Sequence, residues 1–430
     1  MFSKLTKVTS TLPSLAKQVV RANQHINHHA KWISTSSGNK RSDVLTQNQQ
    51  QPNDKLKLEQ QERWRVRRTE RFLSTLNYSM PLAANSTAVS KDECREFMSV
   101  FPDLVRDLTE KAKKYDSKDA SKWLARALQY NVPCGKKNRG LATVLAYKSL
   151  IANESELTPE NVRLAHYLGW CVEMLQSTFL IMDDIMDGSQ TRRGQPCWYK
   201  LEDVKLTAIN DALMIENCIY VILKKYFSHL PSYMKLVELV HETMLITTIG
   251  QSLDLQTANR DVSCFTMDRY KSIVDHKTAY YTFYLPVALA MHLAGYEDPE
   301  VFRQAKTILL EMGHFFQVQD DFLDCFGNPE VTGKIGTDIQ DNKCTWLSVL
   351  CMQRATEAQK QIMRDCYGKH DEECVNRVKQ LYEDLGLPHT YSLYEEESYN
   401  LIKTHIQQTS RGVPHSIFFK IMDKIYRRES

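Results

Sequence analysis

The chain has 430 residues, 42% of them hydrophobic, which is enough apolar material for one large domain or two smaller ones with buried cores. Its net charge is +3, but residues 1–41 hold seven Lys or Arg and no acid, so the remainder carries 48 basic against 52 acidic residues and lacks the basic surface of a nucleic-acid-binding protein. Eleven cysteines without a C-x-x-C pair argue against a zinc knuckle or disulfide framework, and the absence of an apolar run of 18 or more residues predicts no transmembrane segment.

The N-terminal segment, residues 1–41, intersperses its basic residues with Leu and Val and is rich in Ser and Thr. This composition is typical of a mitochondrial transit peptide and predicts a mitochondrial location; the alternative is a basic tail on a cytoplasmic protein. Residues 42–90 are rich in Gln, Asn and Ser and lack hydrophobic periodicity, which predicts a polar, disordered linker.

Residues 91–430 differ from this N-terminal part, because hydrophobic residues recur there with a period of 3.6 and breaks are short. The pattern predicts one all-α domain. The clearest predicted helix runs from Pro159 to Asp187, with one core stripe formed by Leu164, Leu168, Cys171, Leu175, Thr178 and Met182. Further predicted helices cover approximately residues 205–228, 232–257, 266–294, 298–325 and 343–366.

Two aspartate-rich boxes, DDIMD at 183–187 and DDFLD at 320–324, end apolar helical runs. Positions i and i+4 share a helix face, so the first and last Asp of each box repel each other unless a cation lies between them. Carboxylate oxygens suit Mg²⁺, which completes its octahedron with water and phosphate oxygens. One such box is common on exposed helices, but two beside core stripes predict a magnesium site. The candidate metal residues are Asp183, Asp184, Asp187, Asp320, Asp321 and Asp324.

Basic residues accompany both boxes and could supply the positive charge that bound diphosphates require. In the segment YNVPCGKKNRG (130–140), Gly135 and Gly140 free the backbone for close approach to an anion. Interleaved with the acids, the basic set predicts two diphosphates and bridging metal ions; it comprises Lys136, Arg139, Arg192, Arg193, Lys334 and Lys343.

Six segments together resemble the eukaryotic farnesyl diphosphate synthases of the trans-prenyltransferase family: YNVPCGKKNRG, LQSTFLIMDDIMD, TRRGQPCWY, GQSLDL, HKTAYYTFYLP and FFQVQDDFLDCFGNPEVTGKIGTDIQDNKCTW. The resemblance extends from about Asp92 to Arg428. It implies an isoprenoid-synthase-type helical bundle around a central catalytic cavity, a homodimer and three Mg²⁺ ions per active site. The implied reaction joins isopentenyl diphosphate head to tail with dimethylallyl and then geranyl diphosphate, giving farnesyl diphosphate.

The resemblance also implies residue roles. Direct metal ligands would be Asp183, Asp187 and Asp320, supported by Asp184, Asp321 and Asp324. The allylic diphosphate would be held by Arg192, Lys277 and Lys334, and isopentenyl diphosphate by Lys136, Arg139, Gln176 and Arg193. Further expected substrate contacts are Lys343 and, at the C-terminus, Arg428. Dipoles near the allylic carbocation would come from Lys277, Thr278 and Gln317.

Product length is expected to depend on Phe179 and Thr178, which lie four and five residues before Asp183, roughly 6–7.5 Å deeper along the helix. A bulky side chain there would stop the growing prenyl tail, so Phe179 predicts a C15 product. Thr178 stands where the family usually has an aromatic residue, and it either admits some C20 product or faces the core stripe. Cys134 replaces a usual glycine and could crowd the isopentenyl diphosphate site.

Three alternatives stay open. A terpene synthase, which is a lyase, would use the same boxes without isopentenyl diphosphate, but the four residues expected at that second site count against it. A geranyl or geranylgeranyl diphosphate synthase would differ only in product length. A non-catalytic regulatory subunit or lipid-binding module would be favoured by loss of an acid box, and both boxes are intact.

Overall fold

A computed structural model of the protein describes residues 91–115, 118–328, 331, 336–409 and 412–426. The predicted transit peptide and linker, residues 1–90, lie outside these ranges, so both stay predictions.

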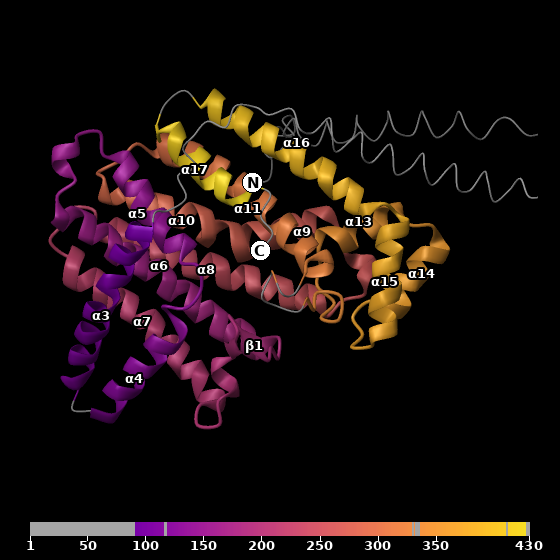
Figure 1. Cartoon of the computed structure of the whole chain (residues 1–430), viewed down its shortest axis with the longest axis horizontal. Helices are drawn as coiled ribbons and strands as arrows, with labels where there is room; N and C mark the ends of the chain where they lie inside the picture. The colour runs from indigo at the N-terminus through magenta and orange to yellow at the C-terminus, as the bar shows by residue number, and fades with distance from the viewer. Residues whose placement is uncertain (1–90, 116–117, 329–330, 332–335, 410–411, 427–430) are drawn as a thin grey trace, which may run out of the picture. The chain divides into compact units, whose positions relative to one another are not determined.

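Helices make up most of the described chain (Figure 1), which confirms the all-α prediction. The α-helices are α3 (Lys91–Lys113), α4 (Lys118–Asn131), α5 (Asn138–Leu150), α6 (Pro159–Met186), α7 (Ala208–Phe227), α8 (Tyr233–Ala258), α9 (Met267–Val274), α10 (Leu285–Leu293), α11 (Pro299–Phe326), α13 (Trp346–Arg354), α14 (Glu357–Cys366), α15 (Glu372–Asp384), α16 (Leu387–Gln408) and α17 (His415–Ile425). Short 3-10 turns are η1 (Glu154–Glu156), η2 (Trp198–Lys200), η3 (Lys205–Thr207) and η4 (Val262–Cys264), and a π-helix, η5 (Asp275–Tyr284), joins α9 to α10.

Helix α6 carries the first acid box at its C-terminal end. It begins where Thr158 accepts a hydrogen bond from the Asn161 N–H and Pro159 presets the first turn. It ends at Met186, so its predicted bounds are confirmed to within one residue. Residues 165–175 are buried on every side, because α3, α5, α7 and α10 all pack against α6. The stripe expected from the sequence is therefore only part of its buried surface.

The helix predicted over 343–366 is wrong as a continuous element, because α13 ends before Ala355 and α14 starts after Thr356. The backbone of Ala355 is extended, and the Thr356 side chain caps α14 in a reciprocal pair with Gln359. A threonine cap offers the backbone an alternative to helical hydrogen bonds, which stops the preceding helix.

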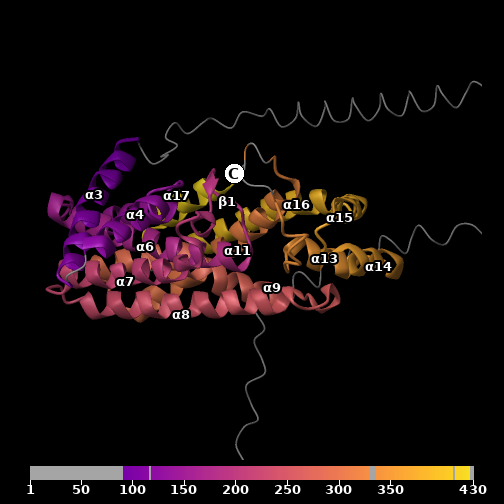
Figure 2. The same ribbon diagram turned by 90° about the horizontal axis from the view of Figure 1, so that it is seen from below.

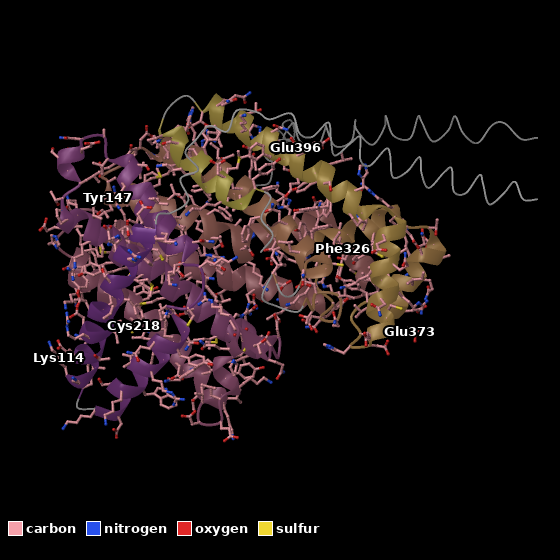
Figure 3. All side chains as sticks on the ribbon, in the orientation of Figure 1. Lys114, Tyr147, Cys218, Phe326, Glu373 and Glu396 are labelled. Carbon is pink, nitrogen blue, oxygen red and sulfur yellow. The ribbon has the colours of Figure 1, made fainter. Side chains whose placement is uncertain are left out.

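Two hydrophobic clusters form the interior. Figure 3 labels Tyr147 and Cys218 of the larger cluster and Phe326, which packs against the smaller one. The larger lies among α3–α8, η5, α10, the N-terminal part of α11, the C-terminal part of α16 and α17. The smaller lies among η4, α9, the C-terminal part of α11, α13–α15 and the N-terminal part of α16. Helix α11 belongs to both, since Phe315 is in the larger cluster and Val318 in the smaller. Val318 and Cys325, which flank the second acid box on α11, both belong to the smaller cluster, so the box lies beside that cluster, just after α11 leaves the larger one.

One described stretch, Lys205–Phe227, is long and apolar enough to cross a membrane by length and composition alone. Within it, 44% of the apolar window is buried inside the protein, including Ile215, Ile219 and Leu223. Its helix α7 packs against α6 and runs beside α8 (Figure 2). A core helix of this kind passes the same test, so the stretch is weak support for a membrane span.

Candidate active site

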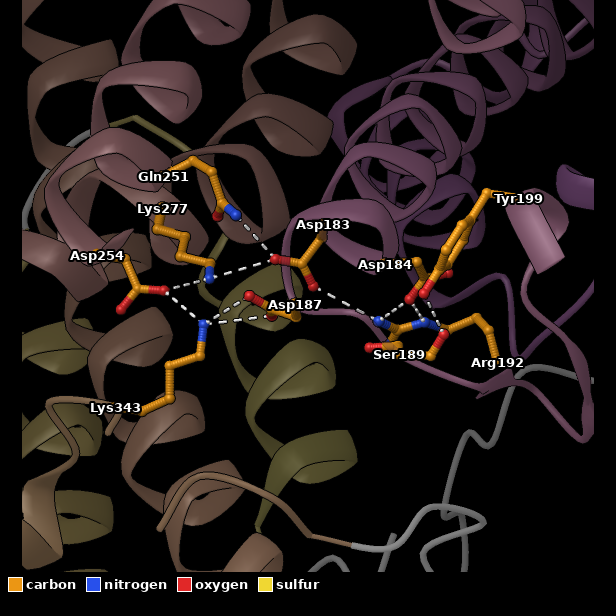
Figure 4. Close-up of polar contacts among 10 residues, drawn as sticks. All are labelled: Asp183, Asp184, Asp187, Ser189, Arg192, Tyr199, Gln251, Asp254, Lys277 and Lys343. Atoms are coloured by element: carbon orange, nitrogen blue, oxygen red, sulfur yellow. Dashed lines mark hydrogen bonds and ion pairs between the residues drawn. The ribbon is translucent and has the colours of Figure 1, made fainter. Parts of the chain in front are cut away.

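The first acid box divides its carboxylates between two directions (Figure 4). Asp183 accepts a hydrogen bond from Gln251 Nε2 at 2.9 Å and lies 3.4 Å from the Lys277 ammonium. Asp187, one turn later, accepts from Lys343 Nζ at 3.0 Å. Asp184 is buried on another side, where it accepts from Arg192 at 2.6 and 2.9 Å. Asp183 and Asp187 therefore share a face, as predicted, while Asp184 anchors an arginine.

Arg192 ends the first strand of a β-hairpin, and Arg193 is the first residue of its two-residue turn, so their side chains point to different neighbours. Strands β1 (Thr191–Arg192) and β2 (Gln195–Pro196) pair antiparallel, and Arg193 and Gly194 both have positive φ, 55° and 74°. Such a turn reverses the chain tightly. Arg192 reaches the first box, whereas Arg193 donates to the Asn131 carbonyl at 3.2 Å and packs on Gly135. Gly135 has a φ of 91°, which favours glycine, and a Cβ there would lie 2.7 Å from Arg193 Nε.

Asp254 on α8 joins the two lysines that face the first box. It is 5% exposed and accepts from Lys277 at 2.6 Å and from Lys343 at 3.3 Å. Burial by itself would lower the pKa of Lys277, but Asp254 and Asp183 raise it above its ordinary value. Both ammonium groups are therefore kept charged and directed at the space beside Asp183 and Asp187.

The second acid box lies on α11. Asp321 is buried and accepts hydrogen bonds from Gln317 Nε2 at 2.9 Å and the Trp346 N–H at 2.8 Å, while burial raises its pKa to about 7. Asp324 accepts from the Asp338 N–H at 3.0 Å. The Lys343 N–H in turn donates to the Asp338 carbonyl. These bonds tie the segment after the second box to the lysine that reaches Asp187.

The chemistry of the carboxylates fits Mg²⁺. No cluster of three or more His, Cys, Asp or Glu side chains within the described ranges already has metal-binding geometry. Burial, followed by repulsion from Asp183, raises the pKa of Asp187, so a cation between them is favourable. The Lys277 and Lys343 ammonium groups supply that charge here, and the oxygens are hard ligands of the kind Mg²⁺ takes.

Neutral polar side chains surround Arg139, at the start of α5. Its guanidinium donates to Gln176 Oε1 on α6 at 3.0 Å, and to the Tyr281 and Thr282 hydroxyls of η5. Its charge also lies over the Tyr281 ring, 4.8 Å from the centroid. Lys136 is exposed in the preceding loop. Cys134 donates its thiol hydrogen to the Tyr130 carbonyl and lines a small cavity beside Arg193.

The two residues predicted to limit product length have different neighbours. Thr178 is 3% exposed, and its hydroxyl lies 3.2 Å from the Met174 carbonyl oxygen and 3.3 Å from that of Ala212 on α7. The Phe179 ring is part-buried and lies 6.0 Å from the Tyr281 ring, on the side of Arg139. Thr178 therefore faces the α6–α7 contact, which is the second of the two readings its sequence position left open.

The remaining predicted residues are distributed as follows. Lys277 and Thr278 lie on η5, and Gln317 lies on α11, which packs against η5. Lys334 and Arg428 lie outside the described residues.

Sequence reasoning missed several polar partners of these residues. Gln251 and Asp254 belong to the segment GQSLDL, which was recognised without an assigned role. Glu173 carried no signal, because it interrupts an apolar helical run; it is 2% exposed and accepts the Gly140 N–H at 2.8 Å. Thr282 was equally hidden in an aromatic segment.

Comparisons with known proteins identify the family of the chain. The polyprenyl synthetase family model matches residues 121–385. The chain is 49% identical over 348 residues to the farnesyl pyrophosphate synthase of Nezara viridula, covering 81% of this chain and 86% of that one. It is 49% identical over 344 residues to the Homo sapiens enzyme of that name, covering 79% and 82%.

Solved structures lead to the same family. Farnesyl diphosphate synthase of T. brucei complexed with risedronate superposes with a TM-score of 0.73 at 32% identity, over 79% of this chain and all of that one. The isoprenoid-synthase-type helical fold implied by the sequence motifs is thereby confirmed. The two acid boxes, the cations around them and these similarities lead to one conclusion. The chain belongs to the polyprenyl synthetase family, among the eukaryotic farnesyl diphosphate synthases.

Proposed function

We propose that the protein is a prenyltransferase that condenses isopentenyl diphosphate with dimethylallyl and then geranyl diphosphate to form farnesyl diphosphate. The observation that carries this proposal is the presence of two distinct cation groups. Lys277, Lys343 and Arg192 face the first acid box, whereas Arg139, held by the neutral Gln176, and the nearby Arg193 form a second group. Each group suits one diphosphate, and a reaction between two diphosphate substrates needs both.

The chain's own residues divide the chemical work. Mg²⁺ dependence is general in this family; the ion, when bound at Asp183, Asp187 and Asp320, supplies charge that stabilises the departing diphosphate. Lys277, Lys343 and Arg192 hold that diphosphate while the allylic C–O bond breaks. The part-buried Phe179 and buried Tyr281 help to exclude water from the resulting carbocation, so that the isopentenyl double bond attacks it.

In this scheme, dipoles of the protein stabilise the allylic carbocation. The Lys277 carbonyl, the Thr278 hydroxyl and Gln317 are the groups we assign to it, with η5 and α11 in contact. The departed diphosphate then takes the proton from the new C15 or C10 chain. No side-chain nucleophile or histidine base is required.

Three Mg²⁺ ions per site and a homodimer are finer parts of the proposal. A self-complementary surface is supported by apolar side chains exposed on α7, α8 and the turn before α7: Leu206, Ile209, Leu213, Met234, Leu245 and Ile249, each at least 43% exposed. Light scattering after size exclusion should give about twice the chain mass. A monomer at micromolar concentration would contradict the dimer.

Product analysis tests the main proposal. Purified protein with labelled isopentenyl and dimethylallyl diphosphates plus Mg²⁺ should yield geranyl diphosphate early and farnesyl diphosphate as the main end product. Release of a cyclic or linear hydrocarbon without consumption of isopentenyl diphosphate would instead indicate a terpene synthase. The Arg139–Gln176 pair disfavours that outcome, because a lyase needs no second diphosphate site.

We also propose that residues 1–41 direct the protein to mitochondria, since they carry seven basic residues and no acid. Fused to a fluorescent reporter, the segment should colocalise with a mitochondrial marker. A diffuse cytoplasmic signal would reduce it to a basic tail.

A further inference from the structure

One hydroxyl oxygen accepts two hydrogen bonds from one edge of the Arg139 guanidinium. Thr282 Oγ1 accepts from Arg139 Nε at 3.2 Å and from Nη2 at 3.0 Å. Nη2 also donates to the Tyr281 hydroxyl at 3.2 Å, and Nη1 donates to Gln176 Oε1 at 3.0 Å. The Nε–Nη2 edge is thus occupied, and among the described residues one Nη1 hydrogen has no protein acceptor.

We propose that Thr282 is a positioning residue for isopentenyl diphosphate, which rests on the function proposed above. Its hydroxyl fixes the rotation of the Arg139 guanidinium so that the Nη1 side meets the diphosphate. An arginine side chain loses substantial rotamer entropy when it is ordered, and a guanidinium held before substrate arrives incurs that cost during folding instead.

A hydroxyl suits this task better than a carboxylate would. It orients the guanidinium without neutralising it, so the full positive charge remains for the substrate. The buried carboxylate nearby, Glu173, is directed elsewhere, because it accepts the Gly140 N–H at 2.8 Å and so anchors the backbone next to Arg139. Arg139 therefore keeps its positive charge, while the neutral Thr282 hydroxyl sets the orientation of its guanidinium.

Thr282 is well placed to be rigid. It is 9% exposed, its β-branched side chain has few rotamers, and it lies on the π-helix η5. The same element carries Lys277, which faces Asp183 and Asp254 on the allylic side. One π-helix thus orients a cation at each of the two substrate sites, in keeping with the frequent occurrence of such segments at functional sites.

Thr282→Val tests the assignment, since it keeps the shape and removes the acceptor. Loss of bonds to a charged donor should raise the KM for isopentenyl diphosphate about tenfold, with kcat and the allylic KM changed less than about twofold. Thr282→Ser, which keeps the hydroxyl, should stay within about threefold of wild type. The matched control is Thr243→Val, a buried threonine bonded only to its own helix, and it should leave both KM values unchanged.

Calorimetric titration with isopentenyl diphosphate alone separates this inference from the proposed reaction. The Kd should rise about tenfold in Thr282→Val whether or not the wild type makes product. Equal affinity in the two proteins, or a serine variant as weak as the valine variant, would overturn the positioning role. A wild type that binds but does not condense would refute only the reaction. If Thr282→Val fails to fold by circular dichroism, Thr282→Ala gives the same comparison.

Discussion

The carboxylates within the acid boxes have different surroundings, so we expect them to have different roles. Asp183 and Asp187 face two lysines, whereas Asp184 and Asp321 are buried and bonded to an arginine and a helix N-terminus. The first kind would bind the proposed metal ion. The second kind holds its neighbours in place.

Asp183→Ala or Asp320→Ala should lower kcat about 1,000-fold or more, because each removes an expected metal ligand. The fold should survive loss of Asp183, since Lys277 keeps Asp254 as a partner and Lys343 keeps Asp187. Steady-state kinetics and circular dichroism measure the two effects. Asp365→Ala, an exposed aspartate on α14, is the control. Near-normal turnover in either box variant would refute the metal model.

Substitutions of Arg192 and Arg193 should raise the KM of different substrates, although the two residues are adjacent. Arg192→Gln weakens the group facing the first box and should raise the allylic KM about tenfold. Arg193→Gln should do the same to the KM for isopentenyl diphosphate, because its side chain lies against Gly135. If both variants changed the same KM, the hairpin would not separate the two sites.

Phe179→Ala should shift the product from C15 toward C20, because the part-buried ring lies beside Tyr281, about 6 Å below Asp183. Thr178→Ala is the matched control and should still stop at C15, since Thr178 faces α7. Chromatography of dephosphorylated products measures both. The assignment of Phe179 fails if its alanine variant makes only C15.

Contact between helices α8 and η5 places Lys277. Gly250 on α8 lies against the η5 backbone, where an added Cβ would be 2.5 Å from the His276 carbonyl carbon and closer still to the Lys277 nitrogen. Neither neighbour is a flexible side-chain end. The two helices can approach this closely only at glycine.

Gly250→Ala should therefore lower the free energy of unfolding by about 1–3 kcal/mol and raise the allylic KM. Urea unfolding and initial-rate kinetics measure the two effects. Ser252→Ala, on the exposed side of the same helix, should change neither. Unchanged stability and KM in Gly250→Ala would mean that α8 and η5 can separate freely.

Acid should destabilise the whole molecule in part through His314 on α11. Burial, helped by Lys271, lowers its pKa to about 4, and its Nδ1 is buried without a protein partner in the described chain. The unfolded chain binds a proton near pH 6.5 and the folded chain does not until about pH 4. Stability is therefore full above pH 6.5 and is lost as the pH falls toward 4.

His314→Gln removes this contribution, so its unfolding free energy should fall less than that of wild type between pH 7 and 4.5, by about 1–3 kcal/mol. Comparing two proteins isolates His314 from Asp321, whose raised pKa acts in the opposite direction. Parallel stability curves would show that His314 titrates normally.

The sequence alone determined the helical class, the bounds of α6 and the two acid boxes, because these depend on short-range periodicity, caps and i, i+4 spacing. Its motifs also identified the family. The break between α13 and α14 was missed, since an extended residue at Ala355 leaves the hydrophobic period almost unchanged.

Only the tertiary structure decided which side chains meet. Asp254 contacts lysines 23 and 89 residues away, and Thr282 contacts Arg139 across 143 residues. Thr178 and Phe179 are neighbours in sequence, yet one faces α7 and the other Tyr281. Such pairings depend on how helices pack against one another, and helical periodicity marks a face as buried without naming its partner.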